Sequence, residues 1–326
     1  MTRIPPDLLT ILTRHDRFLI VGHVDADGDA VGSVLALALA LRSLGKEVCA
    51  GLPLAVPRRY RFLPDAETIT LTPPNPPPPV SIAVDCAALN RAEQFVPAMQ
   101  AAEHLVNLDH HGSNKGYGSL NLVETDAAAV GLIVYDILGA LGVKITAELA
   151  TCLYCATGTD TGFFRFANTS PRALEVCAAL VRAGARPQEI VEQVYLLRPA
   201  GHYHLLGRAL ASFTLELGGR VSCAQLTEED FAAADVGPDE TEGIIDQLRM
   251  VEGTVVAVLM RYDRPGWVKV SLRSRGLADV GAVAGSLGGG GHPQAAGFEM
   301  ETDLDTCKQR TLAALATALD APLPVG

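Results

Sequence analysis

Aspartate and histidine residues gather at four points of the sequence, and their types suit the binding of metal ions. The nine residues are His23, Asp25, Asp27 and Asp29, then Asp85, then Asp109, His110 and His111, and finally Asp160. Carboxylates that lie together raise one another's pKa unless a cation compensates their charge. Oxygen and nitrogen ligands without a nearby thiolate favour Mn²⁺ or another octahedral ion over a cysteine-bound zinc. We therefore expect two metal ions that share carboxylates, an arrangement suited to displacement at phosphorus.

Short apolar strands would have to position these residues. Strands are expected over 18–22, 47–51, 80–84 and 104–108, and three of them lead directly into His23, Asp85 and Asp109. Helices are expected over 30–44, from Thr125 or Asp126 to 141, and over 146–156. This alternation is typical of βαβ units and a mostly parallel sheet covered on both faces. Because ligands bind beyond the carboxyl ends of such strands, we expect the three tips to meet there.

The C-terminal part of the chain has a different pattern. Strands are expected over 213–217, 221–225, 254–259 and 267–272, with helices over 228–233, 279–286 and 303–319. The predicted fold class is α/β, with a doubly wound, mostly parallel sheet in an N-terminal domain and a smaller α+β C-terminal domain. We place the metal-binding domain at 1–188, a helical linker at 189–211 and a substrate-binding domain at 212–326.

Several motifs together resemble one known family. The segments 23–33 (HVDADGDAVGS), 109–111 (DHH) and 160–162 (DTG) are similar to those of the DHH phosphoesterase superfamily. The segments 271–275 (SLRSR) and 288–298 (GGGGHPQAAGF) resemble the DHH-associated C-terminal domain. The combination points to the NrnA-like branch, which contains short oligoribonucleases that also dephosphorylate 3′-phosphoadenosine-5′-phosphate (pAp).

The resemblance implies a role for each residue of the first three motifs. The implied metal ligands are His23, Asp27, Asp29, Asp85, His110 and Asp160, with Asp85 and Asp160 as the bridging carboxylates. Asp25 and Ala26 replace the Asn-Pro that the family usually has, and we expect Asp25 to stay outside the ligand set. Asp109 would orient a histidine, and His111 would face the scissile phosphate as a donor or general acid.

The C-terminal motifs imply a site for the nucleotide. The implied substrate contacts are Arg273, Ser274, Gly289, Gly290, Gly291 and His292, together with Arg165 and Arg249. Glycine allows backbone N–H groups to approach phosphate closely, although the residues alone leave a plain flexible turn as an equal alternative. Six cations and only two acids occur over 249–275. Within this basic stretch, Arg261 and Arg264 are interpreted as part of a solvated face.

The resemblance implies an Mn²⁺-dependent hydrolase with two ions per chain, acting on short RNA and on pAp. We expect substrates of about two to five nucleotides, because the chain lacks an extended stacking platform for long strands. Cyclic-di-AMP or pApA phosphodiesterase activity, which uses the same machinery, remains an alternative. A family II-type pyrophosphatase, a RecJ-like single-strand DNA exonuclease and a non-enzymatic nucleotide sensor fit the motifs less well.

Composition limits the partners and the compartment. The chain of 326 residues has a net charge of −11, which disfavours binding to duplex DNA. Its seven cysteines lie mostly in apolar runs, which favours buried thiols over disulfides, and the pair Cys152 and Cys155 is interpreted as core. The N-terminus does not resemble a signal peptide, and no apolar run reaches the ~20 residues of a membrane span. We expect a cytoplasmic protein without membrane contact, and a homodimer is compatible with related proteins.

Overall fold

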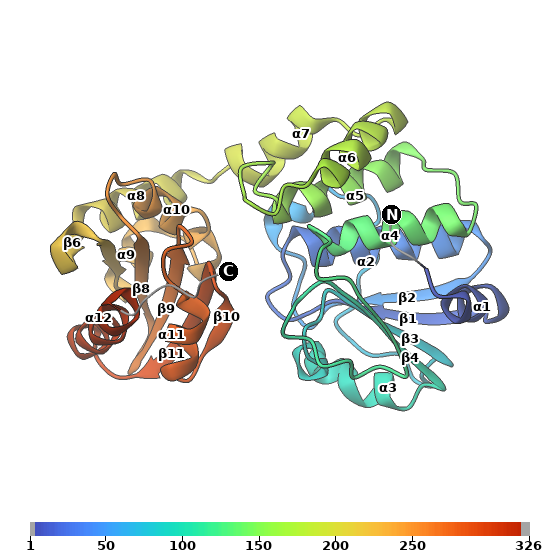
Figure 1. The fold of residues 1–326 in the computed structure, drawn as a ribbon, viewed down its shortest axis with the longest axis horizontal. Helices are drawn as coiled ribbons and strands as arrows, with labels where there is room; N and C mark the ends of the chain where they lie inside the picture. The colour runs from blue at the N-terminus through green and yellow to red at the C-terminus, as the bar shows by residue number, and fades with distance from the viewer. Residues whose placement is uncertain (1–3, 321–326) are drawn as a thin grey trace. The chain divides into compact units, whose positions relative to one another are not determined.

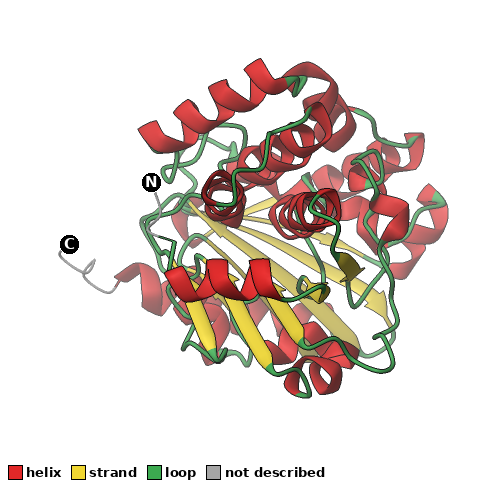
Figure 2. Ribbon diagram, turned by 90° about the vertical axis from the view of Figure 1, so that its right-hand side faces the viewer, coloured by secondary structure: helices red, strands yellow, loops and turns green. Residues whose placement is uncertain are grey.

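The structure is a computed structural model that describes residues 4–320, and its backbone contacts divide the chain between Leu197 and Arg198. Each of the two units contains one sheet with helices on both faces (Figures 1 and 2). Helix α7 (Pro187–Val191) belongs to the first unit and α8 (Ala200–Ala211) to the second. The functional boundaries expected at 188 and 211 stay predictions.

The sheet of the first unit consists of five parallel strands in the order β2-β1-β3-β4-β5. The strands are β1 (Arg17–Val21), β2 (Glu47–Gly51), β3 (Val80–Val84), β4 (His104–Asp109) and β5 (Leu120–Val123). Chain order reverses between β1 and β3, because β2 lies on one side of β1 and β3 on the other. In open parallel sheets such a switch point opens a crevice at the carboxyl ends of the strands.

Helices cover both faces of this sheet (Figure 1). One core packs the sheet against α1 (Pro6–Arg14), α2 (Gly28–Ser43), α4 (Val130–Ala140), α5 (Ala147–Asp160) and α6 (Pro171–Ala183). The other face packs against the 3₁₀ segment η3 (Leu89–Phe95) and α3 (Val96–Gln100). Burial on both faces explains why the central strand β3 is apolar along nearly its whole length.

The second unit contains a mixed six-stranded sheet in the order β10-β11-β9-β8-β7-β6. Its strands are β6 (Thr214–Glu216), β7 (Val221–Leu226), β8 (Val256–Arg264), β9 (Trp267–Ser274), β10 (Gly290–His292) and β11 (Ala295–Glu301). Helices α11 (Val280–Ser286) and α12 (Leu304–Asp320) pack on one face. Helices α8, α9 (Glu228–Ala234) and α10 (Ile244–Arg249) pack on the other face, against β7 and β8.

The predicted α/β class with a separate C-terminal sheet domain is confirmed. Strands β2 and β3 match the expected residues, whereas β5, β10, β11 and α10 were not expected. Helix α4 begins at Val130 rather than near Thr125, and α5 extends to Asp160 rather than ending near Ala156. Cys152 and Cys155 are buried, as expected. Within the described residues, no helix combines the length and apolarity needed to cross a membrane.

Candidate metal centre

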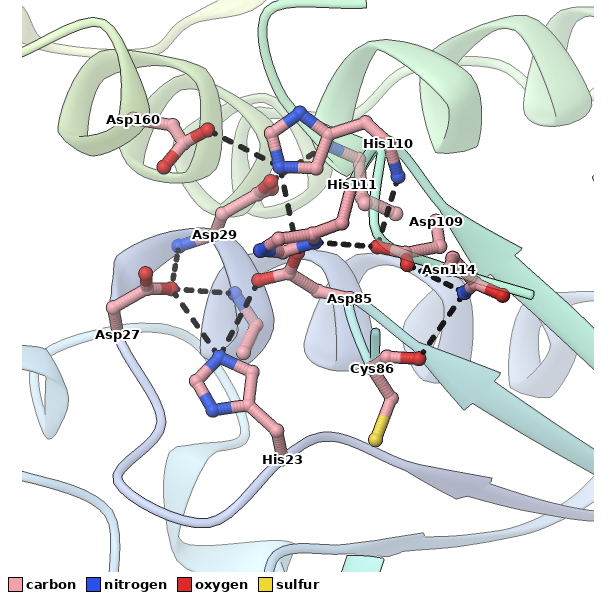
Figure 3. Close-up of polar contacts among 12 residues, drawn as sticks. His23, Asp27, Asp29, Asp85, Cys86, Asp109, His110, His111, Asn114 and Asp160 are labelled. Carbon is pink, nitrogen blue, oxygen red and sulfur yellow. Dashed lines mark hydrogen bonds and ion pairs between the residues drawn. The ribbon is translucent and has the colours of Figure 1, made fainter. Parts of the chain in front are cut away.

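The sheet order places the polar strand tips next to one another. Strand β3 pairs with β1 on one side and with β4 on the other, so His23, Asp85 and Asp109 follow or end adjacent strands. Asp29 at the start of α2 and Asp160 at the end of α5 complete the group from the helices above (Figure 3). The site therefore lies at the switch point of the sheet.

The loop after β1 is held by its backbone and by Arg91 from η3. The Val24 N–H donates to the Arg91 carbonyl (2.8 Å), and the Arg91 guanidinium donates back to the Val24 carbonyl (3.0 Å). His23 Nδ1 lies 2.7 Å from the Val24 carbonyl and 3.0 Å from the Arg91 guanidinium, so both an acceptor and a donor face this nitrogen. Nε2 faces Asp85 Oδ2 at 3.5 Å and Asp27 Oδ1 at 4.0 Å.

Asp27 and Asp29 both stabilise helix N-termini, but of different helices. Asp27 caps α2 by accepting the N–H groups of Asp29 (3.0 Å) and Ala30 (3.1 Å). Asp29 is fully buried and accepts the N–H groups of Val130 (2.6 Å) and Gly131 (2.9 Å) at the start of α4. This remote cap explains why α4 starts at Val130 without a side-chain cap from its own sequence.

Asp85 lies at the centre of the site in a left-handed backbone conformation (φ 57°). Its side chain is only 2% exposed, and Oδ1 accepts no hydrogen bond from any of the residues 4–320. His111 Nδ1 lies 3.5 Å and His110 Nε2 lies 3.6 Å from Oδ1. Buried carboxylate oxygens without a hydrogen bond are rare, and a cation is the partner that suits this one.

The tip of β4 orients two histidines in different ways. Asp109 Oδ1 accepts the His110 N–H (2.8 Å) and His111 Nδ1–H (2.7 Å), so its carboxylate is occupied within the protein. His110 Nδ1 lies 3.0 Å from the Ala127 carbonyl, which leaves Nε2 directed at Asp160 Oδ2 (3.4 Å) and Asp85. Asp109 thus holds residues of the site rather than facing its centre (Figure 3).

Sequence reasoning missed Asn114, which completes this arrangement. Asn114 Nδ2 donates to Asp109 Oδ2 at 2.6 Å, and its Oδ1 accepts from Asn107 at 3.1 Å and from the Gly116 N–H at 2.8 Å. Asn107 also donates to Asn121 at 3.1 Å, so an amide chain leads from the sheet to Asp109. The only indication in the sequence is a polar residue three positions after His111, which is weak by itself.

Three carboxylates of the centre have raised pKa values. Burial, together with the charges of Asp29 and Asp27, raises the pKa of Asp85 and of Asp160 well above the ordinary value of 3.8. Burial also raises the pKa of Asp29, although His110 opposes the shift. Mutual repulsion of this kind is relieved when a divalent cation binds between the carboxylates.

The pKa values of Asp27 and Asp109 are instead lowered. Burial favours the neutral acid at both, but His23 and two backbone N–H groups hold the pKa of Asp27 below its usual value. At Asp109, the hydrogen bond and charge of His111, with help from Asn114, outweigh burial and lower the pKa. Asp109 is therefore the ionised acceptor that keeps the His111 proton on Nδ1.

The donor atoms form three groups in which all atoms lie within 4.8 Å of one another: His23, Asp27 and Asp85; Asp85, His110 and His111; and Asp29, His110 and Asp160. Asp85 and His110 each belong to two groups; the two oxygens of Asp85 could serve two neighbouring ions, whereas the Nε2 of His110 could bind only one. All six residues expected as ligands are present in these groups, together with His111. Asp25 is exposed and belongs to none of them.

Asp160 is presented by the last turn of α5 and by an unusual bend after it. Gly162, Phe163 and Phe164 are all left-handed, with φ of 56°, 50° and 68°. The Phe163 ring packs edge-on against Tyr195 (5.4 Å). The expected substrate contact Arg165 donates to the Gly162 carbonyl (2.6 Å) and lies over the Tyr195 ring, so its described contacts are outside the carboxylate cluster.

Apart from Arg165, the residues expected to contact the nucleotide lie in the second unit. Register pairs Arg273 of β9 with Ala295 of β11, and Ala295 with His292 of β10. Paired residues point to the same side of a sheet, so Arg273 and His292 flank the small Ala295 side chain. Arg273 is also paired with Ala257, which packs in the core beneath α10, and Arg249 is the last residue of α10.

Two of the glycines before His292 are required by close packing. A Cβ at Gly289 would lie 2.2 Å from the Gly297 carbonyl oxygen, and one at Gly291 would lie 2.5 Å from the Ala295 carbonyl oxygen. Gly290 has open space where a Cβ would be, and it is exposed. Ser274 is buried and its hydroxyl accepts the Gly276 N–H (3.1 Å), which stabilises the turn after β9.

Comparison with known proteins agrees with this geometry. The model of the DHH family, N-terminal domain, matches residues 17–157, and that of the DHHA1 domain matches 218–321. The chain is 40% identical over 302 residues to the bifunctional oligoribonuclease and PAP phosphatase NrnA of Thermus thermophilus, covering 92% of this chain and 89% of the relative. The NrnA of Bacillus subtilis is 24% identical, with coverage of 89% and 91%.

Solved structures show the same fold. An exopolyphosphatase-related protein from Bacteroides fragilis superposes with a TM-score of 0.89 at 24% identity and covers 95% of both chains. RecJ of Thermus thermophilus in complex with Mn²⁺ gives 0.57 at 15% identity, over 100% of this chain and 57% of that one. The matched domains and the 40% identical relative show that this chain belongs to the DHH family of phosphoesterases, as a hydrolase with a DHHA1 domain.

Proposed function

We propose that the chain is a two-metal, Mn²⁺-dependent phosphodiesterase and phosphatase. Its substrates would be oligoribonucleotides of about two to five nucleotides, cleaved to mononucleotides, and pAp, dephosphorylated to AMP. The observation that carries the proposal is Asp85, a buried carboxylate with an unpartnered oxygen at the junction of two ligand groups. The names of the Thermus and Bacillus relatives support the choice of substrates.

The proposed ion ligands are His23, Asp27, Asp29, Asp85, His110 and Asp160. Two bound ions would supply an activated water and positive charge for the phosphoryl oxygens. His110 Nδ1 faces the Ala127 carbonyl, so His110 would offer the neutral Nε2 that metal binding requires, and His23 would offer its Nε2 beside Asp27 and Asp85. Oxygen and imidazole donors without thiolate suit Mn²⁺.

His111 would act on the phosphate itself. Asp109 accepts a hydrogen bond from His111 Nδ1–H at 2.7 Å and would stabilise a positive charge on the ring. Nε2 could then donate a proton to a phosphoryl or leaving oxygen. Arg273 and His292, with the N–H groups of Gly289 to Gly291, would hold the remaining phosphate and sugar of the nucleotide. The position of the cleaved bond would thus be set by the terminal nucleotide.

A product-resolved assay tests the proposal. Purified protein with Mn²⁺ is given 5′-labelled RNA of 2 to 24 nucleotides, pAp, cyclic-di-AMP and pyrophosphate, with Asp85→Ala as the inactive control. We expect cleavage of the short RNAs and release of phosphate from pAp, both lost in the control. Turnover of pyrophosphate or of the 24-mer alone would contradict the proposed substrates, and turnover of cyclic-di-AMP alone would establish the cyclic dinucleotide alternative.

A further inference from the structure

A polar hollow lies in the second unit, beside the turn that joins β8 to β9. It has a volume of about 200 Å³ and is lined by Pro238, Asp239, Arg261, Arg264, Trp267, Lys269 and Glu299. Three of these seven residues are cations and two are acids, in a chain whose net charge is −11. Trp267 is the single tryptophan of the protein. None of these residues has a role in the function proposed above.

The hollow is built around fixed cationic groups. The Arg261 guanidinium is largely buried and donates to the Pro238 carbonyl (2.9 Å) and to Thr241 Oγ1 (2.7 Å). Arg264 and Lys269 share one carboxylate, Glu299, at 3.3 and 3.8 Å. Asp239 also lines the hollow, so its three cations and two carboxylates leave an excess of one positive charge. Because the Arg261 side chain is largely buried, the sequence-based interpretation of Arg261 as part of a solvated face was wrong.

Trp267 and Arg264 contact each other at the rim of the hollow. The Arg264 guanidinium lies over the indole ring, 4.5 Å from its centroid. Both side chains are partly exposed. Nucleobases stack on aromatic rings and on guanidinium planes, and phosphates pair with the neighbouring cations. The combination of a stacking surface and a residual positive charge is suited to a nucleotide.

The hollow lies on the same face of the sheet as the proposed nucleotide site. Residues 267, 269, 271 and 273 alternate with the buried residues of β9, so Trp267, Lys269 and Arg273 share one face. Between Lys269 and Arg273, Ser271 is paired with Gly297, so this part of the sheet face carries only small residues. Four residues of antiparallel strand separate Lys269 from Arg273, a span of about 14 Å, and Trp267 is about 20 Å away.

We infer that this hollow is a second nucleotide subsite, which binds a distal nucleotide of an oligonucleotide whose terminal nucleotide lies at Arg273 and His292. The inference rests on the proposed function, because it assigns the terminal nucleotide to that site. Along β9, the strand of nucleic acid would pass over Ser271 and Gly297. A single nucleotide such as pAp does not reach from Arg273 to Trp267. The hollow therefore distinguishes short RNA from pAp.

Steady-state kinetics test this inference on the full chain with Mn²⁺. In Trp267→Ala and, separately, in Lys269→Ala, kcat/KM for a five-nucleotide RNA should fall about tenfold relative to kcat/KM for pAp. Trp267→Phe should retain most of the pentamer activity, because the phenyl ring still stacks. Arg220→Ala removes an exposed cation from the opposite edge of the sheet and serves as the matched control, with no change in the ratio.

Equal losses on both substrates, or no loss on the pentamer, would overturn the inference. A wild-type chain that cleaves neither substrate would instead refute the proposed function. A second measurement separates these cases, since the emission of the single tryptophan reports on the hollow directly. In EDTA, at concentrations where anisotropy shows labelled tetraadenylate to be bound, tetraadenylate should change this emission and pAp should not. The same response to both ligands, or to neither, would also overturn the inference.

Discussion

The carboxylate of Asp29 accepts the backbone N–H of Val130 at 2.6 Å, across 101 positions of the sequence. The same carboxylate accepts the Gly131 N–H and the Ser33 hydroxyl, both at 2.9 Å. One proposed metal ligand is thus also the cap of a helix from another part of the chain. The N-terminus of α4 stabilises the negative charge that the site needs.

Replacing Asp29 by alanine should therefore reduce both stability and activity. The change leaves two buried N–H groups without an acceptor, which costs about 1–3 kcal/mol of unfolding free energy. Removal of a carboxyl whose pKa is raised by burial, with a further contribution from the charge of Asp27, offsets part of this loss. Urea denaturation in EDTA measures the stability without any contribution from bound metal.

Asp27→Ala is the matched control for that experiment. Asp27 is half-exposed and caps α2 in the ordinary local way, so the expected loss of stability is about 1 kcal/mol. Both variants should lose Mn²⁺-dependent activity. Equal stabilities for Asp29→Ala and the wild type would show that the link between Asp29 and α4 contributes nothing.

Asp85→Asn should separate stability from function. Without metal, the ionised Asp85 is buried among Asp29 and Asp27, and these raise its pKa. A raised pKa means that the folded state binds the proton more tightly than the unfolded state does. Wild-type stability therefore falls as the pH rises from the pKa of Asp85 in the unfolded chain to its pKa in the folded protein. In EDTA we expect Asp85→Asn to be at least as stable as the wild type at pH 8, with a smaller difference at pH 5.

Addition of Mn²⁺ should reverse this order. The wild type should gain about 2.7 kcal/mol for each bound ion when free Mn²⁺ is 100 times its Kd, whereas Asp85→Asn should gain much less. Thermal melts with and without Mn²⁺ provide the measurement. A metal-free Asp85→Asn that is less stable than the wild type at every pH would contradict the role assigned to repulsion at this carboxylate.

Asn114→Ala should impair catalysis through Asp109. Loss of the 2.6 Å hydrogen bond to Asp109 Oδ2 frees the carboxylate that orients His111. Outer partners of this kind contribute about 10–100-fold to activity or metal affinity. We expect kcat for pAp to fall by that factor while KM changes little, because the described hydrogen bonds of Asn114 join it to Asp109 and its neighbours and to none of the groups assigned to the nucleotide.

Ser119→Ala is the control for Asn114→Ala. Ser119 belongs to the same loop, but it bonds to the backbone of Leu105 and not to Asp109. It should retain wild-type kcat. A loss in KM alone for Asn114→Ala, or a similar loss of kcat in both variants, would refute the positioning role.

Two neighbouring glycines should respond differently to alanine. Gly290→Ala has room for its Cβ, so unfolding free energy should stay within about 0.5 kcal/mol of the wild type. Its new methyl group would lie on the exposed loop assigned to the nucleotide and should raise KM for pAp. Gly289→Ala should instead lower the melting temperature, because its Cβ would meet the Gly297 carbonyl at 2.2 Å.

Melting curves and pAp kinetics on the same preparations check this pair. If Gly290→Ala has the same KM for pAp as the wild type, the segment around Gly290 does not belong to the nucleotide site. Normal stability in Gly289→Ala would show that β10 and β11 can separate without loss, contrary to the packing described here.

The parallel sheet and most of the candidate ligands could be predicted from the sequence. Apolar runs that end in His or Asp mark buried strands and their tips, because burial on both faces demands continuous apolar residues. His23, Asp85 and Asp109 could therefore be placed at one edge of a sheet. The DHH and glycine-rich motifs, being contiguous, carried the resemblance to the family without any tertiary information.

The interactions between distant segments could not be predicted from the sequence. The Asp29 cap on α4 and the contact of Asn114 with Asp109 depend on how segments far apart in the chain pack together. Strand β10 was missed because it is a glycine-rich segment of three residues, whereas β11 does alternate buried and more open positions. Hydrogen bonds and close approaches of this kind are set by packing, which local residue preferences do not encode.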